Sequence, residues 1–423
     1  MYSIRYKSHH DASRQLKQLY TLPVSKEAYI ADILEKPLAG KRVIYLHVPF
    51  CNKICSFCPF HRFDEMRRRE YHHYLIDHMQ RLSNFPYMQQ PFQAVNFGGG
   101  TPTCLLPEQM EQVLKALKTY FPIAQDAEIS VESSATELTD EMLDVLRQGG
   151  VNRLSIGVQS FQDGRRKMLG RRGSGEFAAE RVAAAIRVGI TNTSIDLLYN
   201  LPGQSEEELY KDLQVIRRLN IAGISFYSLM LHENTPLYKK LGEQERQSMA
   251  DVQHEYALYS LILNELARDG FQMLELTKLV RDGLDRYDYM EIRHNRGNCI
   301  AVGHGAGGNI EGYLYHNSIR NPDISNVLPI SSVGRVVSDD YHIMDQFIYS
   351  LQKAKADLHY YSEQLGMDLS HMLAEPLERM EKDGLLVRAD GMLTMTQKGT
   401  FWGNNMIDEL ITFLREQPMQ KTC

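Results

Sequence analysis

The sequence predicts an α/β protein, in which a partial, TIM-like (β/α)6 barrel precedes a mainly helical C-terminal region with winged-helix-like character. Two observations lead to this prediction. Between residues 41 and 230, apolar strand-like runs alternate with amphipathic helical runs about six times, which is the pattern of parallel βαβ units. After about residue 245 the alternation stops, and from about residue 335 helical patterns dominate.

Each element of the alternating region is placed by its own residues. The strand-like runs are 41–50, 94–102, 127–134, 151–160, 193–204 and 224–230. The helical runs between them are 70–85, 107–121, 139–150, 176–190 and 205–220. Thr139 is the expected N-cap of one helix, and Ser205 with Glu208 forms a capping-box pattern in another. Functional residues are expected at the carboxyl ends of such parallel strands.

The later part of the chain follows a different pattern. It contains a helical run (248–269), a glycine-rich stretch (303–313) and a β-hairpin (385–399) with Asp390-Gly391 at its turn. Because its charge is mixed, we expect the winged-helix-like part to be a lid or docking element rather than a DNA-binding one. The expected divisions are an N-terminal extension (1–40), the barrel (41–245), a connecting region that covers the substrate (246–330) and a C-terminal helical domain (331–423).

Composition and charge narrow the class of protein. The 423 residues carry a net charge of −6, which does not indicate a nucleic-acid partner. No run of about 18 apolar residues is present and the N-terminus lacks a signal core, so neither a membrane span nor secretion is expected. Six cysteines, three of them bunched, do not form a secreted disulfide framework, so we expect a cytoplasmic protein.

The three bunched cysteines, Cys51, Cys55 and Cys58, follow the first strand in a C-x3-C-x2-C spacing. Thiolates are soft ligands for zinc, copper(I) or iron–sulfur clusters. A structural zinc site needs four protein ligands, and His47 or His61 could supply the fourth. A [4Fe–4S] cluster held by three cysteines keeps one iron open, where the amine and carboxylate of a small molecule can bind.

Other candidate residues follow later strands. The glycines at 98–100 would let the backbone approach a ligand closely. Glu132 and Asp196 suit ribose hydroxyls or an ammonium group, although a buried salt bridge is the alternative for both. Gln159 and Arg171 could hold a carboxylate, with a plain surface charge as the alternative for the arginine.

The cysteine loop YLHVPFCNKICSFC is similar to the cluster loop of radical S-adenosylmethionine (SAM) enzymes. The motifs GGGTPT (98–103), VES (131–133), GVQSF (157–161), LGR (169–171) and SIDLLYNLPGQ (194–204) resemble one branch of these enzymes, which contains the oxygen-independent coproporphyrinogen III oxidases. The resemblance covers residues from about 40 to 400. It implies a radical SAM barrel, with a [4Fe–4S] cluster on Cys51, Cys55 and Cys58.

The same resemblance implies that two SAM molecules share the site. The cluster-bound molecule would contact Tyr45, Gly99 and Glu132. The second would contact Phe57, Gly100, Thr101, Gln159, Arg171 and Asp196. The backbone near Leu229 and the GAGGNI stretch (305–310), through Ile310, complete the implied cofactor contacts. As isolated residues, Tyr45, Phe57 and Leu229 are more typical of a core.

Three groups within this branch differ at recognisable positions. Coproporphyrinogen III oxidases carry an extra cysteine where this chain has Phe60. Heme chaperones carry His-Asn followed shortly by Tyr-Trp, whereas here His294-Asn295 is followed by RGNC. Anaerobilin synthases resemble this chain in length, in the N-terminal extension and in the CPF ending of the cluster loop. The GAGGNI stretch also fits the third group, which we favour.

That resemblance implies a radical SAM C-methyltransferase that opens heme anaerobically, forms a methylated linear tetrapyrrole and releases iron. The expected partners are heme as substrate, a flavodoxin or flavin reductase as electron donor, and a heme-delivery or product-reducing protein. No catalytic residue is assigned. The unranked candidates for the axial ligand of heme are His232, His294, His304 and His316. A protein that binds heme and passes it on unchanged is the non-enzymatic alternative.

Overall fold

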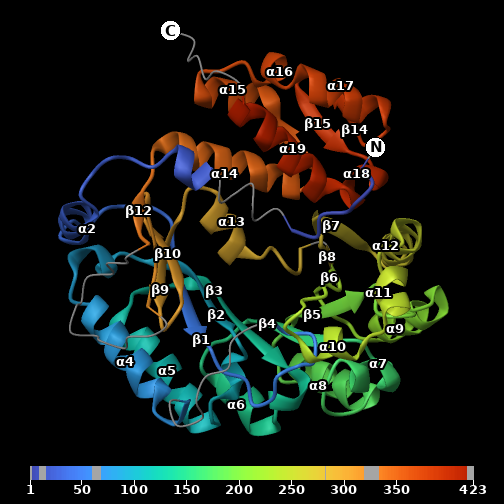
Figure 1. Cartoon of the computed structure of the whole chain (residues 1–423). Helices are drawn as coiled ribbons and strands as arrows, with labels where there is room; N and C mark the ends of the chain where they lie inside the picture. Colours follow the sequence, from blue (N-terminus) through green and yellow to red (C-terminus); the bar gives the residue numbers. More distant parts are fainter. Residues whose placement is uncertain (1, 9–15, 60–67, 282, 319–332, 417–423) are drawn as a thin grey trace.

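The computed structural model describes residues 2–8, 16–59, 68–281, 283–318 and 333–416. At its centre is a twelve-stranded, curved sheet with the order β12-β11-β10-β9-β1-β2-β3-β4-β5-β6-β8-β7 (Figure 1). From β9 to β6, neighbouring strands run parallel. These parallel strands are β1 (Arg42–Val48), β2 (Phe92–Gly99), β3 (Ile123–Ser134), β4 (Arg153–Gln159), β5 (Asn192–Tyr199), β6 (Gly223–Ser228) and β9 (Asn298–Val302).

The helices that connect the parallel strands cover the outer side of the sheet (Figure 1). They are α4 (Tyr71–Leu82), α5 (Pro107–Tyr120), α6 (Asp140–Gln148), α7 (Asp163–Met168), α8 (Gly175–Arg187) and α9 (Glu206–Arg218). The predicted caps are present, because Thr139 accepts from the Met142 amide and Ser205 forms a reciprocal capping box with Glu208. The predicted α/β fold class is confirmed.

Both edges of the sheet come from residues beyond the alternating region. On one edge, β8 (Lys278–Arg281) pairs antiparallel with β6, and β7 (Phe271–Glu275) pairs with β8. On the other, β9 is followed by β10 (Gly307–Ile310), β11 (Tyr313–His316) and β12 (Arg335–Val336), all antiparallel. Part of the stretch expected to cover the substrate therefore belongs to the sheet itself.

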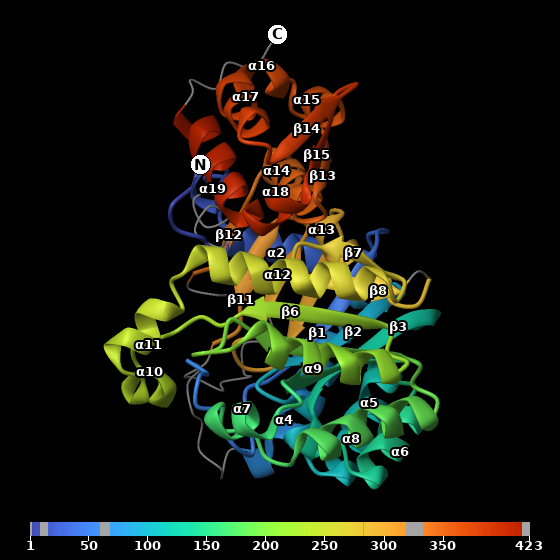
Figure 2. The same ribbon diagram turned by 90° about the vertical axis from the view of Figure 1, so that its right-hand side faces the viewer.

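The C-terminal region packs at one end of the sheet (Figure 2). It contains the antiparallel strands β13 (Lys355–Asp357), β15 (Met392–Met395) and β14 (Leu386–Ala389). Asp390 and Gly391, with φ of 52° and 78°, form the predicted hairpin turn, since a type I′ turn needs positive φ at both positions. The helices of this region are α14 (Asp339–Gln352), α15 (Leu358–Leu365), α16 (Leu369–Met372), α17 (Ala374–Lys382), α18 (Gln397–Phe401) and α19 (Gly403–Glu416).

The remaining helices flank the barrel. They are α2 (Lys26–Leu34), α10 (Pro236–Lys240), α11 (Glu243–Ser248), α12 (Val252–Ala267) and α13 (Asp288–His294). The N-terminal segment 2–8 connects these parts, because Arg5 pairs with Glu255 of α12 and donates to the carbonyl of Phe401 at 2.7 Å. Among the described residues, no helix is both long enough and apolar enough to cross a membrane.

A cluster of paired charges is buried inside the barrel. Arg153 Nε lies 3.0 Å from Asp285 Oδ1, and Lys278 Nζ lies 3.1 Å from Asp285 Oδ2. The hydroxyl of Ser194 also donates to Asp285, at 2.7 Å. Burial alone would raise the pKa of Asp285, but Lys278 and Arg153 outweigh it and hold that pKa below its usual range.

Candidate active site

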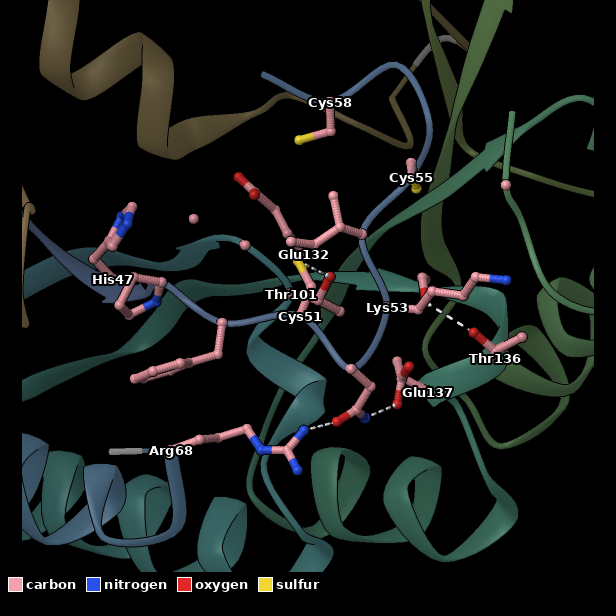
Figure 3. Close-up of a pocket in the computed structure, with 18 of the residues that line it drawn as sticks. His47, Cys51, Lys53, Cys55, Cys58, Arg68, Thr101, Glu132, Thr136 and Glu137 are labelled. Atoms are coloured by element: carbon pink, nitrogen blue, oxygen red, sulfur yellow. Dashed lines mark hydrogen bonds between the residues drawn. The ribbon is translucent and has the colours of Figure 1, made fainter. Parts of the chain in front are cut away.

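A cavity of about 980 Å³ opens at the carboxyl edge of the parallel strands (Figure 3). This volume is at the upper end of the ~300–1,000 Å³ typical of small-molecule pockets. Its walls include the loops after β1, β2, β3 and β9, which parallel pairing brings to one edge. The predicted site residues that line it are Tyr45, Cys51, Cys55, Phe57, Cys58, Gly99, Gly100, Thr101, Glu132 and Arg171.

The three cysteines lie along the loop that follows β1 (Figure 3). Cys51 Sγ is 3.4 Å from the hydroxyl oxygen of Thr101, and Arg171 Nη1 donates to Cys55 Sγ at 3.2 Å. The backbone amide of Ser56 donates to the Leu169 carbonyl at 2.9 Å, which ties the loop to the end of α7. The segment after β2 and the segment after α7 therefore position the thiols.

The chemistry of this donor set suits an iron–sulfur cluster, because three soft thiol ligands share one loop beside a cavity that exceeds the size of a single ion. In the zinc alternative, His47 was one candidate for the fourth ligand, and its Nδ1 lies 2.9 Å from the hydroxyl of Tyr45. His61, the other candidate, and Phe60 lie outside the described residues. Within the described ranges, no three His, Cys, Asp or Glu side chains surround one metal-ion position.

The glycine loop after β2 is shaped by packing within the site. A Cβ on Gly100 would lie 2.4 Å from the carbonyl oxygen of Phe50, and one on Gly98 would lie 2.8 Å from a carboxylate oxygen of Glu132. Gly99 has φ of 116°, which side chains rarely permit. We expected these glycines to make room for a ligand. Their small size is needed because Phe50 and Glu132 pack directly against this loop. Gly99 and Gly100 also line the cavity.

Glu132 presents a half-buried carboxyl group to the cavity. Burial and the nearby Asp196 raise its pKa to about 7, against the opposing effect of hydrogen bonds from Asn96 and the Gly99 amide. Asn96 Nδ2 donates to it at 3.5 Å, but no ion pair reaches it from any described residue. A cationic ligand would supply the missing charge and favour the carboxylate form.

Asp196 and Gln159 stand next to the cavity but are not among its lining residues. Asp196 accepts from the Ser155 hydroxyl at 3.3 Å, and burial raises its pKa against the opposing effect of Lys278. Gln159 ends β4 with φ of 72°, a left-handed conformation that is uncommon for non-glycine residues. Their predicted contacts with a second SAM stay predictions.

Leu229 and Ile310, the last two predicted contacts, also do not line the cavity. Leu229 is buried in an apolar cluster against which Phe57 packs, and its carbonyl accepts from Lys7 Nζ at 2.9 Å. Ile310 is fully buried in the main core on β10. A side-chain contact between Ile310 and a cofactor in the cavity therefore has no support from this placement.

Several polar residues of the cavity wall were not predicted. Asn52 donates to a Glu137 carboxylate oxygen at 2.5 Å and accepts from Arg68 (Figure 3). Lys53 and Arg172 also line the cavity. Position within the cysteine loop could have identified Asn52 and Lys53, whereas Arg68 and Glu137 depend on how separate segments pack.

The four histidines considered as axial ligands of heme differ in whether they line the cavity. His304, which follows β9, lines the cavity together with the neighbouring Gly305. His232, His294 and His316 are not among the residues that line it.

Comparison with known proteins agrees with this geometry. Residues 45–216 match the family model of the radical SAM superfamily. The chain is 29% identical to anaerobilin synthase of Escherichia coli O157:H7 over 398 residues, which is 92% of this chain and 89% of that protein. It is 26% identical to the heme chaperone HemW of Bacillus subtilis over 379 residues, which is 86% of this chain and 97% of that protein.

The fold is that of a known structure. Coproporphyrinogen III oxidase (HemN) from Escherichia coli, a radical SAM enzyme, superimposes with a TM-score of 0.79 at 22% identity, covering 97% of this chain and 96% of that one. Residues 45–216 therefore match a radical SAM domain, and the chain as a whole has the fold of HemN. This domain family implies a [4Fe–4S] cluster and SAM as cofactors.

Proposed function

We propose that this chain, with its radical SAM domain, is a C-methyltransferase that opens heme without oxygen. The products are a methylated linear tetrapyrrole, anaerobilin, and free iron. The observation that carries the proposal is the shared cavity, where the three cysteines, most predicted SAM contacts and the start of the GAGGNI stretch line one space. The similarity to anaerobilin synthase over 92% of the chain supports it.

In this proposal the residues divide the work of binding. Cys51, Cys55 and Cys58 would hold the cluster, while the Glu132 carboxylate would accept a hydrogen bond from the amino group of the cluster-bound SAM. Arg171 would hold the carboxylate of the second SAM through its guanidinium group. When bound and reduced, the cluster supplies the electron that cleaves a carbon–sulfur bond of SAM. Phe57, Gly100, Thr101, Gln159 and Asp196 would hold a second SAM, the source of the transferred carbon.

The charge of the cavity wall also suits heme, whose two propionates are anionic. The cationic side chains that line the cavity outnumber the two carboxylates, Glu132 and Glu137. Arginine is suited to bind such carboxylates through paired hydrogen bonds. The cationic residues are Lys53, Arg68, Arg171 and Arg172.

The test is an anaerobic reaction of the cluster-loaded chain with a reductant, heme and SAM labelled in its methyl group. We expect loss of the heme Soret band together with a labelled, ring-opened tetrapyrrole and released iron. A flavodoxin or flavin reductase should replace the chemical reductant in a reducing cytoplasm.

A second candidate, heme transfer, is favoured by the similarity to HemW over 86% of the chain. An intact Soret band, with heme later surrendered to an apo-acceptor, would replace the methyltransferase proposal with this one. Decarboxylation of coproporphyrinogen III without heme opening would identify the oxidase activity instead.

A further inference from the structure

His304 occupies a position that the radical SAM motifs do not include. It follows β9, which pairs parallel with β1 on the side away from β2. Because the two strands are parallel, the carboxyl end of β9 lies beside the start of the cysteine loop. The His304 side chain is half-buried and lines the cavity together with Cys51, Cys55 and Cys58.

Two tyrosines of α4 hold His304 in place. Its ring stacks on Tyr74, with centroids 4.0 Å apart and planes 20° apart. Its backbone amide donates to the hydroxyl of the buried Tyr71 at 2.9 Å, and that hydroxyl donates to the carbonyl of His47 at 2.8 Å. Ring and backbone are thus fixed by α4 and β1, which is the preorganisation that a ligand-binding side chain needs.

The tautomer of His304 is set by a carbonyl group. Its Nδ1 lies 3.2 Å from the carbonyl oxygen of Ser318. Since a carbonyl only accepts hydrogen bonds, a hydrogen bond between these two atoms assigns the proton to Nδ1. This is the arrangement by which a neutral imidazole binds a metal, with its other nitrogen hydrogen-bonded to a supporting group.

The other candidate histidines have different surroundings. His294 Nδ1 lies 3.0 Å from Asp345 Oδ2, and its ring stacks on Tyr349 with centroids 4.4 Å apart. His316 is exposed on β11, and His232 lies in the loop after β6. None of these three lines the cavity with the cysteines.

The geometry points to His304 as the axial ligand of the heme iron, bound through Nε2. This inference rests on the proposed function, in which heme is the substrate. Histidine is a common axial ligand of heme iron. Ligation at His304 keeps the macrocycle in the same cavity as the cysteine loop, where SAM is expected.

The experiment measures heme ligation without turnover. Ferric heme is added to the cluster-loaded chain in the absence of SAM and reductant, and absorbance and EPR spectra are recorded with the dissociation constant. The wild type should give a histidine-ligated spectrum. His304→Gly should lose it and bind heme at least about 10–100-fold more weakly, and added imidazole should restore the spectrum.

Two further variants make the result decisive. His316→Gln removes an exposed histidine of the same region and should leave the spectrum unchanged. His304→Gln keeps an amide donor for the Ser318 carbonyl, so it provides the readout if His304→Gly does not fold.

The possible outcomes distinguish an error in the His304 assignment from an error in the proposed function. A histidine-ligated spectrum that persists in both His304 variants, or a wild-type spectrum without histidine ligation, would overturn the assignment. If the wild type still opened heme when given SAM and reductant, the proposed function would stand without it. A wild type that neither binds nor opens heme would overturn both.

Discussion

Two carboxylates, the buried Asp285 and the half-buried Glu132, have opposite electrostatic surroundings. Asp285 is paired with Arg153 and Lys278 inside the barrel, and its pKa lies below the usual range despite burial. Glu132 lines the cavity, where burial and Asp196 raise its pKa to about 7. Arg153 and Lys278 neutralise the charge of Asp285, whereas no described residue forms an ion pair with Glu132.

This comparison distinguishes a carboxylate that stabilises the fold from one that is available to bind a ligand. A buried charge is tolerated when a partner and hydrogen bonds compensate its desolvation. The partners of Asp285 come from the fold, so its role is structural. Among the described residues no cation pairs with Glu132, so we propose that its partner is a bound ligand. The buried salt bridge considered from sequence thus fits Asp285, which sequence reasoning did not single out, better than Glu132.

Removing a cavity thiol should have the largest effect. Cys55→Ala is expected to abolish the cluster, because in our proposal each cysteine would hold one iron. Bound iron and visible absorbance after anaerobic reconstitution measure this loss. Cys299→Ala, which removes a buried thiol of β9 outside the cavity, is the control and should keep the full cluster. A complete cluster in Cys55→Ala would refute the ligand assignment.

Breaking the structural pair should reduce stability strongly. Asp285→Asn removes the ion-pair partner of the buried Lys278 and leaves Arg153 with only Glu128, at 3.9 Å, so we expect a loss of about 3–5 kcal/mol in the free energy of unfolding. Urea denaturation of the chain measures it. Glu132→Gln is the matched variant and should change this free energy by less than about 1 kcal/mol, because no ion pair is lost. Equal losses in the two variants would contradict the comparison.

Glu132→Gln should instead weaken SAM binding. A hydrogen bond to a charged group is worth about 1.5–3 kcal/mol, so we expect SAM affinity to fall by that amount. Calorimetric titration of the cluster-loaded chain provides the measurement. Glu137→Gln serves as the control, because Glu137 already accepts from Asn52. The binding role of Glu132 would be lost if both variants weakened SAM equally.

The pH dependence of SAM binding should be the smallest effect. With a pKa of about 7 in the free protein, Glu132 is largely protonated below pH 7 and carries its charge above it. SAM affinity should therefore rise as pH increases through about 7. Because Glu132 is already ionised at higher pH, SAM binding should release fewer protons there. Titrations across this range check it, and Glu132→Gln should flatten the curve. A wild-type curve as flat as that of the variant would remove Glu132 from the explanation.

Much of the fold follows from local sequence patterns. The alternating periodicity of residues 41–230 predicted the parallel strands, since each strand and helix buries its own apolar face. Parallel pairing then predicted that the ends of the strands would meet, and Cys51, Thr101 and Glu132 do line one cavity. The caps at Thr139 and Ser205 were equally local signals.

Other features depend on long-range packing. The local sequences of β8 and β9 do not predict that β8 pairs with β6 or that β9 pairs with β1. The position of His304 beside the cysteine loop follows from that pairing, so sequence could not rank it above the other histidines. Position 100 requires glycine because the carbonyl of Phe50, fifty positions earlier, packs against it, and this contact exists only in the folded chain.

The most direct test of the proposed chemistry is to measure 5′-deoxyadenosine formed from SAM by the reduced, cluster-loaded chain, with and without heme. We expect heme to increase the formation of 5′-deoxyadenosine strongly, with SAM cleaved for each heme that is opened. Slow SAM cleavage at the same rate with and without heme, while the heme stays intact, would contradict it.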